Sequence, residues 1–320
     1  MTARAALGSW LHDAGLSPRA LAAWAGTDRL SALPALVPPD RPATPASTLL
    51  ALFVAGQDVP VGRVALAEEL ERERLVAIEA GRIHARVSIL PLGQALLVCD
   101  RLDTSDGLDI VCWPDDSSYH LARALPPGRV TRWLDLGCGS GFAALLRPEL
   151  AAQIVGADLN PRAVHYATLG SALTGIRHAS FVEADLADGV PAELRGGCEL
   201  VTCNAPIPEP GLGPVRARWR ATDAAFVERL FGQARAFVAA DGMVVVHAAL
   251  DAIAPVVATL AGDRVVVAYT PEGVRGFAIA WWRPAGENRL IRARRALTAC
   301  RPHLVHEDRL DAVAGTLPPL

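Results

Sequence analysis

Lysine is absent from this 320-residue sequence, so all 31 of its strongly basic residues are arginines. A lysine therefore cannot act as a general base or form a Schiff base with a substrate. The six cysteines contain no C-x-x-C pair, which argues against a zinc site, and we expect no bound metal. The sequence has no secretory signal pattern and no apolar run of membrane-spanning length. We expect a cytoplasmic protein with reduced thiols.

A strong charge of either sign is also missing, because 34 acidic residues nearly balance the basic ones and leave a net charge of −3. This balance gives no overall attraction to nucleic acid or to an anionic membrane. Hydrophobic residues make up 51% of the chain, which is enough for sizeable buried cores. Because 320 residues exceed one typical domain, we expect two.

The most informative stretch is Arg132–Phe142, which reads RWLDLGCGSGF. An apolar run passes into glycines at Gly137, Gly139 and Gly141, a pattern that predicts a strand, a tight turn and a helix. Such a turn brings a ligand to a helix N-terminus. The third glycine comes one residue too early for the dinucleotide motif G-x-G-x-x-G, which has glycine where Phe142 stands.

Aspartates end the next two predicted strands. Asp158 closes Gln153–Leu159, and Asp185 follows His178–Ala184. A carboxylate at the tip of the second strand can accept both hydroxyls of a ribose. The alternatives are a helix cap for Asp158 and an ordinary loop residue for Asp185.

A fourth predicted strand, Glu199–Cys203, leads into Asn204-Ala205-Pro206-Ile207. Beyond it we expect helices and strands in alternation, which indicates a parallel sheet buried on both faces. The helices span Asp223–Ala239 and Asp251–Ala261, and the strands span Met243–Leu250, Arg264–Thr270 and Gly276–Arg283. The last two strands lie close together in the sequence and read as a hairpin.

The pattern D-x-G-x-G-x-G, from Asp135 to Gly141, resembles motif I of the class I S-adenosylmethionine-dependent methyltransferases. The resemblance implies a Rossmann-like α/β sheet, mostly parallel with an antiparallel last strand, and S-adenosyl-L-methionine as cofactor. It implies cofactor contacts from residues of these strand ends and of the fourth strand's end, namely Asp135, Gly137, Gly139, Gly141, Asp158, Asp185 and Asn204.

The segment Asn204–Ile207 resembles the (N/D)-P-P-(Y/F) motif of methyltransferases that act on amine or planar nitrogens, including the release-factor glutamine methyltransferases. The resemblance implies that Asn204 accepts a hydrogen bond from the target N–H, and that Pro206 and Ile207 contact the substrate. Ala205 replaces the first proline, and Ile207 replaces the stacking aromatic residue. A plain turn is the alternative.

The amino-terminal region reads as helices followed by a hairpin, which suggests a winged-helix-like module. The expected helices are Ala3–Ala14, Arg19–Ala25, Ala46–Ala55 and a longer helix or helix pair over Val61–Ala80, and the hairpin joins Arg82–Leu90 to Ala95–Cys99. Interspersed glutamates offset its arginines, which argues against DNA binding. A lid, a substrate module, a dimerisation surface and a simple packing domain remain open. We expect this domain over 1–100, a connection over 101–130 and the catalytic domain over 131–320.

Polar side chains of two further segments are candidates for the site. In the connection, Asp115 can accept from a cationic substrate, and Tyr119 and His120 can hydrogen-bond to it. The alternative is a helix start capped by Ser117 or Ser118. Glu209 lies five residues beyond Asn204, within reach of a target nitrogen.

These features together predict an S-adenosylmethionine-dependent N-methyltransferase with Asn204, Glu209 and Asp115 as catalytic residues. Ile207 argues against a glutamine amide as substrate, which favours an amine or guanidine of a small metabolite. A free amino acid such as arginine, in natural-product biosynthesis, is the leading expectation. The alternatives are methylation of a protein glutamine or an rRNA base, and a non-catalytic scaffold that retains the fold. A homodimer is compatible with the amino-terminal module.

Overall fold

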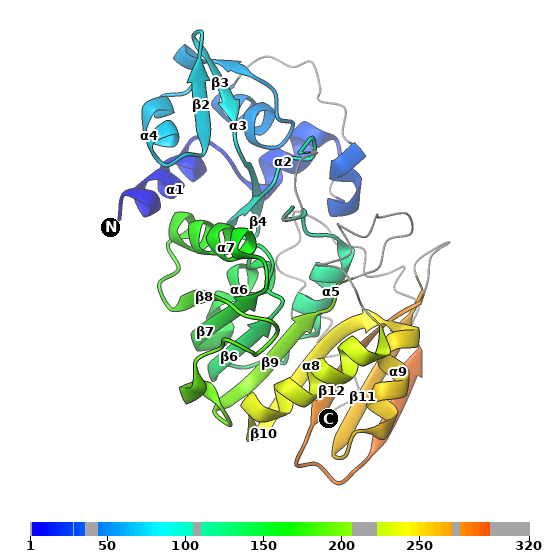
Figure 1. Cartoon of the computed structure of the whole chain (residues 1–320). Coiled ribbons are helices and arrows are strands. Elements are labelled where there is room, and N and C mark those ends of the chain that lie inside the picture. Colours follow the sequence, from blue (N-terminus) through cyan, green and yellow to red (C-terminus); the bar gives the residue numbers. More distant parts are fainter. Residues whose placement is uncertain are drawn as a thin grey trace.

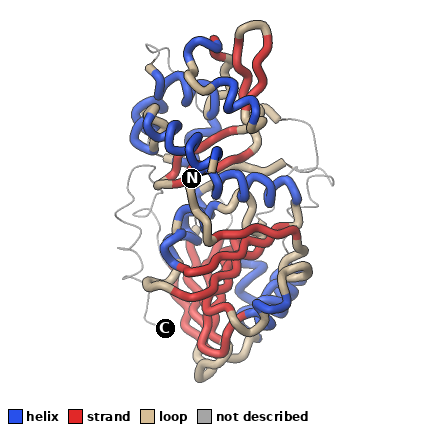
Figure 2. Tube along the Cα trace, turned by 90° about the vertical axis from the view of Figure 1, so that its left-hand side faces the viewer, coloured by secondary structure: helices blue, strands red, loops and turns tan. Residues whose placement is uncertain are grey.

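The computed structural model describes residues 2–27, 29–35, 44–104, 110–206, 223–270 and 276–294. Figure 1 shows the amino-terminal helices and short strands at one end of the molecule and a large sheet with its helices at the other. Helices lie on both sides of this sheet (Figure 2). None of the helices in these ranges is long and apolar enough to span a membrane.

The large sheet has eight strands in the order β13-β11-β12-β10-β9-β6-β7-β8. In chain order they are β6 (Val130–Leu136), β7 (Ala151–Asp158), β8 (Ala179–Glu183), β9 (Cys198–Asn204), β10 (Val238–Ala249), β11 (Asp263–Tyr269), β12 (Phe277–Arg283) and β13 (Leu290–Arg294). The five from β10 to β8 in this order pair in parallel, and β12 runs antiparallel to both of its neighbours. The predicted mostly parallel sheet with an antiparallel last strand is therefore confirmed, and β13 adds a strand that the sequence pattern did not indicate.

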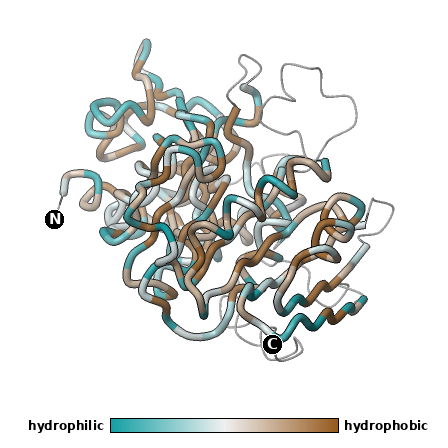
Figure 3. Tube along the Cα trace, turned by 60° about the horizontal axis from the view of Figure 1, so that its bottom comes forward, coloured by the Kyte–Doolittle hydropathy of each residue, from teal (hydrophilic) through white to brown (hydrophobic). Residues whose placement is uncertain are grey.

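Helices cover both faces of this sheet because its side chains are apolar on both. Helices α8 (Ala224–Phe237) and α9 (Leu250–Thr259) pack on the face that carries Leu134 and Val246. Helices α5 (Asp116–Ala124) and α6 (Phe142–Leu146) pack on the face that carries Trp133 and Val245. Successive strand residues point to opposite faces. In Figure 3 much of the hydrophobic colour accordingly lies on segments in the interior of the molecule.

The amino-terminal module contains helices α1 (Ala3–Asp13), α2 (Pro18–Ala25), α3 (Pro45–Phe53) and α4 (Ala67–Arg72). Strands β1 (Val59–Pro60), β2 (Val76–Glu79) and β3 (Arg82–Ala85) form a small sheet in the order β1-β3-β2. Helix α4 lies between β1 and β2 in the chain, which is a winged-helix-like arrangement.

The helix predicted over Val61–Ala80 is wrong beyond α4. Val76–Glu79 instead forms strand β2, which pairs with β3 through a turn at Ala80 and Gly81, both with positive φ. The predicted hairpin arm Arg82–Leu90 is therefore not one strand. Its first part forms β3, and its last part belongs to the next strand, β4 (Ser88–Leu92). The segment from Val76 to Glu79 has only four residues, which are too few for hydrophobic periodicity to distinguish a strand from a helix. The turn that follows it determines that the segment forms a strand.

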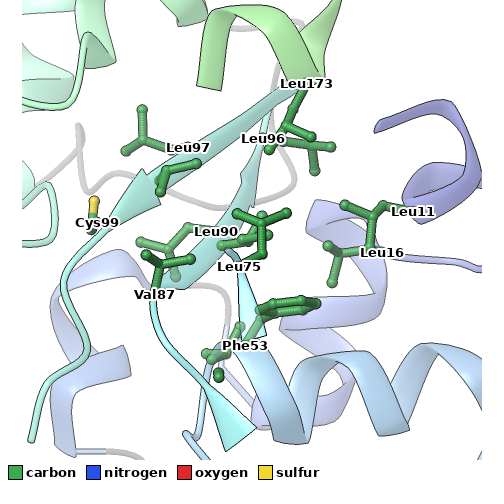
Figure 4. Packing of buried hydrophobic residues seen from close by; sticks show 14 of the residues in the cluster. Leu11, Leu16, Phe53, Leu75, Val87, Leu90, Leu96, Leu97, Cys99 and Leu173 are labelled. Atoms are coloured by element: carbon green, nitrogen blue, oxygen red, sulfur yellow. The ribbon is translucent and has the colours of Figure 1, made fainter. Parts of the chain in front are cut away.

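The second hairpin joins the two parts of the molecule. Strands β4 (Ser88–Leu92) and β5 (Ala95–Cys99) are buried along their whole length and pair with each other. The bounds of β5 are those predicted, whereas β4 takes only the end of the predicted arm and extends to Leu92. They lie between the amino-terminal helices and α7 (Pro161–Thr174), so one apolar cluster runs from the module to the large sheet's own helix. Figure 4 shows Leu11 and Phe53 in this cluster together with Leu96 and Leu173. The core is therefore continuous across position 100.

Helix α1 approaches α7 closely at Gly8. A Cβ placed on Gly8 would lie 1.8 Å from the carbonyl oxygen of Leu173, so only glycine fits this crossing. We predict that Gly8→Ala lowers the free energy of unfolding by about 1–3 kcal/mol, because overpacking at a backbone contact outweighs the better helix propensity of alanine. Urea unfolding measures the change. Gly62→Ala is the matched control, because a Cβ there meets no atom within 4 Å. Equal shifts in the two variants would contradict this packing.

Candidate active site

The glycine turn lies between β6 and α6, where the chain makes three left-handed bends. Gly137, Gly139 and Gly141 have φ of 64°, 55° and 79°. A Cβ on Gly139 would meet no atom within 4 Å, so this backbone borders open space. A Cβ on Gly141 would lie 3.1 Å from Ala167 and from Phe181. Gly141 therefore serves the close packing of α6 on its neighbours, and it is not among the described residues that line the cavity.

A cavity of about 750 Å³ opens beside this turn, at the carboxyl ends of the parallel strands. In open α/β sheets this edge is where ligands bind. The predicted site residues that line it are Asp115, Asp135, Gly137, Gly139, Asp158, Asp185, Asn204 and Pro206. The structure thus brings together side chains from four strand ends and from the segment before α5. The volume of the cavity lies within the ordinary range for small-molecule and cofactor sites.

Asp158 ends β7 and ties the glycine turn to that strand. Its Oδ2 accepts the backbone N–H of Gly139 at 2.7 Å, and its Oδ1 accepts that of Asn160 at 2.9 Å. Asn160, not Asp158, is the N-cap of α7, so the helix-cap alternative for Asp158 does not hold. Burial raises the pKa of the Asp158 carboxyl. A buried carboxylate with spare lone pairs beside a turn can accept further hydroxyl groups.

Asp135 lies deeper in the same wall. Its Oδ1 accepts the Thr202 hydroxyl at 2.5 Å, and that hydroxyl accepts the indole N–H of Trp133 at 2.7 Å. Burial is the main cause that raises the pKa of Asp135 to about 7; the charge of Asp158 contributes to this rise, and the Thr202 hydrogen bond opposes it. Asp135 is therefore partly protonated near neutral pH.

Asp185 follows β8 at the outer part of the cavity. Its carboxylate accepts from Arg229 of α8 at 2.8 Å, and both side chains are about 45% exposed. An exposed pair of this kind contributes little to stability. Both residues line the cavity, so the pair can open to a ligand at low cost.

Asn204, the last residue of β9, has the hydroxyls of Ser117 and Ser118 on one side and the ring of His247 on the other. Its Nδ2 is 3.0 Å from the Ser117 hydroxyl, and its Oδ1 is 2.9 Å from Nδ1 of His247. Pro206 also lines the cavity. Ile207 and Glu209, which the sequence places in the same site, lie outside the described residues.

Asp115 is the N-cap of α5, a role that the alternative interpretation of this segment gave to Ser117 or Ser118. Its Oδ1 accepts the backbone N–H of Ser117 at 2.9 Å and the Ser117 hydroxyl at 2.5 Å. A carboxylate has a second oxygen and further lone pairs, so this cap leaves acceptor capacity at the cavity wall.

Tyr119 and His120 are not among the described residues that line the cavity, so their contact with the substrate stays a prediction. Ser117, Ser118 and Leu121 line it, and the 100° step of a helix turns the two residues between them away. The Tyr119 ring instead packs edge-on against Phe142 at 5.1 Å. The His120 ring lies 5.0 Å from the Tyr269 ring, and burial lowers its pKa to about 4.

Two residues of this region have no counterpart among the predicted site residues. His247 of β10 is fully buried beside Asn204, and its Nε2 lies 2.5 Å from the Tyr269 hydroxyl of β11. The available signal is the single histidine near the carboxyl end of an otherwise apolar strand, MVVVHAAL. A buried polar side chain in such a run needs a partner.

The class of protein follows from this architecture and from a sequence match. The strand order, the glycine turn and the aspartates at the strand ends are those of the fold expected above. Residues 112–257 match the model of the methyltransferase small domain family. These residues, a little under half of the chain, therefore carry a methyltransferase small domain of the class I S-adenosylmethionine-dependent type, whose cofactor is S-adenosyl-L-methionine.

Individual relatives share shorter or more distant similarity. The ubiquinone biosynthesis O-methyltransferase of Xanthomonas axonopodis pv. citri is 35% identical over 85 residues, which are 27% of this chain and 34% of that protein. The chain thus spans about a third of that relative's length. A predicted O-methyltransferase from Agrobacterium tumefaciens aligns at 18% identity and a TM-score of 0.42, covering 61% of this chain and 95% of the other. The ribosomal protein L11 methylase of Lactobacillus delbrueckii subsp. bulgaricus aligns at 19% and 0.39, covering 52% and 77%.

The cavity wall suits S-adenosyl-L-methionine on chemical grounds. Gly139 leaves its backbone open to a ligand, and Asp158 offers a carboxylate for the ribose hydroxyls. Leu159 and Leu186 add apolar wall that can accommodate a base, and Asp135 adds a buried carboxylate that can attract the positive charge of the cofactor. The described residues contain no cluster of three metal-binding side chains.

The ribose assignment makes a direct prediction for Asp158. Asp158→Ala should weaken binding of S-adenosylmethionine by about tenfold or more, because each hydrogen bond to a charged acceptor is worth about 1.5–3 kcal/mol. Titration calorimetry measures it. Glu183→Ala is the matched control, since Glu183 pairs with Asp158 in register but is exposed at the adjacent strand end. Unchanged affinity in Asp158→Ala would contradict the assignment.

The raised pKa of Asp135 predicts how cofactor affinity changes with pH. The ionised carboxyl attracts the positive sulfonium, so affinity for S-adenosylmethionine should rise as pH passes upward through about 7. With one linked proton the slope is at most about tenfold per pH unit. The neutral S-adenosylhomocysteine should show a smaller change, and Asp135→Asn should remove the difference. Equal pH dependence of the two ligands in the parent protein would exclude this role.

Proposed function

We propose that this protein transfers a methyl group from S-adenosylmethionine to an amine or guanidine nitrogen of a small metabolite. A free amino acid such as arginine, methylated in a cytoplasmic biosynthetic reaction, is the leading acceptor. The observation that carries the proposal is the Asn204 amide at the cavity wall, with an oxygen that accepts one hydrogen bond from His247. A carbonyl oxygen has two lone pairs, so a second N–H donor can bind there.

The charge of the cavity wall supports a cationic acceptor. Its described residues include five aspartates and one arginine, namely Asp115, Asp135, Asp158, Asp185, Asp223 and Arg229. A cleft lined mainly by one sign of charge concentrates ligands of the opposite sign. An ammonium or guanidinium group fits this preference better than a phosphorylated or carboxylate acceptor does.

Methyl transfer from a sulfonium is a direct displacement, so the protein mainly aligns the nucleophile and excludes water. Asn204 accepts an N–H of the target and thereby leaves the nitrogen lone pair directed away from the amide. Asp115 lies on the same cavity wall and can receive the proton that a cationic nitrogen must lose. Glu209 remains a predicted partner in this step.

The acceptor can be found with labelled cofactor. We expect a small-molecule fraction of a cell extract to carry the methyl label after incubation with the protein and labelled S-adenosylmethionine. An Asn204→Ala reaction is the blank. Label confined to protein or RNA would favour the alternative of a macromolecular substrate. Tight cofactor binding with no labelled product in any fraction would favour a non-catalytic scaffold.

The role of Asn204 can be measured on the acceptor so identified. Asn204→Ala should lower kcat by about 100-fold, the effect of losing alignment at the reacting nitrogen. Affinity for the cofactor should stay nearly unchanged. Asn204→Asp retains an acceptor oxygen and should keep more activity than the alanine variant. A loss of cofactor binding equal to the loss of kcat would argue against a substrate-positioning role.

A further inference from the structure

A chain of hydrogen bonds runs from the core of the sheet to the cavity wall through five side chains. The Tyr269 hydroxyl lies 2.5 Å from Nε2 of His247, and Nδ1 of His247 lies 2.9 Å from Oδ1 of Asn204. Nδ2 of Asn204 lies 3.0 Å from the Ser117 hydroxyl, which lies 2.5 Å from Asp115. The members come from β11, β10, β9 and the start of α5.

The direction of every bond follows from the carboxylate at the end of the chain. A carboxylate only accepts, so the single hydroxyl proton of Ser117 goes to Asp115. Ser117 must then accept from Asn204, and only the amide NH₂ group can donate to it. The amide oxygen is therefore turned toward His247, whose Nδ1 must carry a proton.

His247 has one proton to give in its neutral form. Burial is the main cause that lowers the pKa of His247 to about 3, so the ring is neutral near pH 7. A neutral imidazole with its proton on Nδ1 has an acceptor at Nε2, which fits the Tyr269 hydroxyl as donor. Burial and the charges of Asp115 and Asp116 raise the pKa of that hydroxyl, so it keeps its proton.

We infer that His247 and Tyr269 are positioning residues that hold the Asn204 amide in the one orientation suited to accept a substrate N–H. The inference rests on the proposed function for its catalytic meaning, but the orientation itself does not. An asparagine amide is nearly symmetrical in shape, so packing alone does not distinguish its oxygen from its nitrogen. The hydrogen-bond chain makes that distinction, because the His247 ring donates to the amide on one side and the Ser117 hydroxyl accepts from it on the other.

Backbone pairing and ring packing hold His247 in place. His247 lies opposite Asn204 in the β9–β10 register, and its carbonyl accepts the N–H of Ala205 at 2.9 Å. The imidazole stacks on Phe277 of β12 with 5.7 Å between ring centroids. The Tyr269 ring lies 5.9 Å from Phe277. The rings of His247 and Tyr269 therefore have little freedom to rotate.

The tautomer of His247 tests the inference without any substrate. In protein labelled with ¹⁵N-histidine, long-range ¹H–¹⁵N spectra report which ring nitrogen carries the proton. His247→Gln assigns the signal, and removal of the exposed His165 by His165→Gln is the matched control. We expect His247 to be neutral and protonated at Nδ1, and Tyr269→Phe to shift its Nε2 resonance. A proton on Nε2 in the parent protein would overturn the inference.

Kinetics with the identified acceptor provide the second readout. Tyr269→Phe should lower kcat about fivefold, the size expected for loss of one neutral hydrogen bond, with the KM for cofactor unchanged. A substitution that merely loosened the fold would raise both KM values or lower the unfolding midpoint. If no acceptor is methylated, the proposed function fails while the tautomer result stands. If methyl transfer proceeds with His247 protonated at Nε2, the inferred hydrogen-bond directions are wrong while the proposed function stands.

Discussion

The hydrogen bond from the Gly139 backbone to Asp158 joins the glycine turn of β6 to the tip of β7, and the rest of the site is arranged around it. Gly139 adopts a left-handed backbone conformation that would be strained in a residue with a side chain. Because glycine has no side chain, the backbone of the turn itself borders the cavity. Because the neighbouring strands are parallel, their carboxyl ends fall at one edge of the sheet. Asp135, Asp185 and Asn204 reach the same cavity for this reason alone.

The opposite part of the molecule determines how the edge is covered. Asp100 follows β5, is 2% exposed, and accepts the backbone N–H of Val111 at 2.8 Å and the Tyr166 hydroxyl of α7 at 2.9 Å. Its backbone carbonyl accepts the indole N–H of Trp113. The segment from residue 110 to Asp115, which lines the cavity, is thus held by the end of the amino-terminal hairpin. The two parts of the chain share a core and also share the construction of the site.

Most of the strands, and the meeting of their polar end residues at one cavity, were predictable because both depend on local patterns. The glycines, Asp158 and Asp185 stand at fixed distances from apolar strands, and parallel pairing brings such strand ends together. Tyr119 and His120 are not among the described lining residues, and the sequence does not determine which side of a short helix faces a cavity. The error over Val76–Glu79 has a related cause, since a turn and its partner strand outweighed the local spacing.

The chain from Tyr269 to Asp115 was beyond prediction for another reason. Its members are far apart in sequence, and the contact between His247 and Tyr269 crosses the intervening strand β12. No spacing rule relates such residues. The central claim is that this edge of the sheet holds a sulfonium nucleoside, and a crystal structure with S-adenosylhomocysteine tests it most directly. The account predicts ribose hydroxyls on Asp158 and the adenine near Asp185, and a nucleoside bound elsewhere or turned away from Asp158 would contradict it.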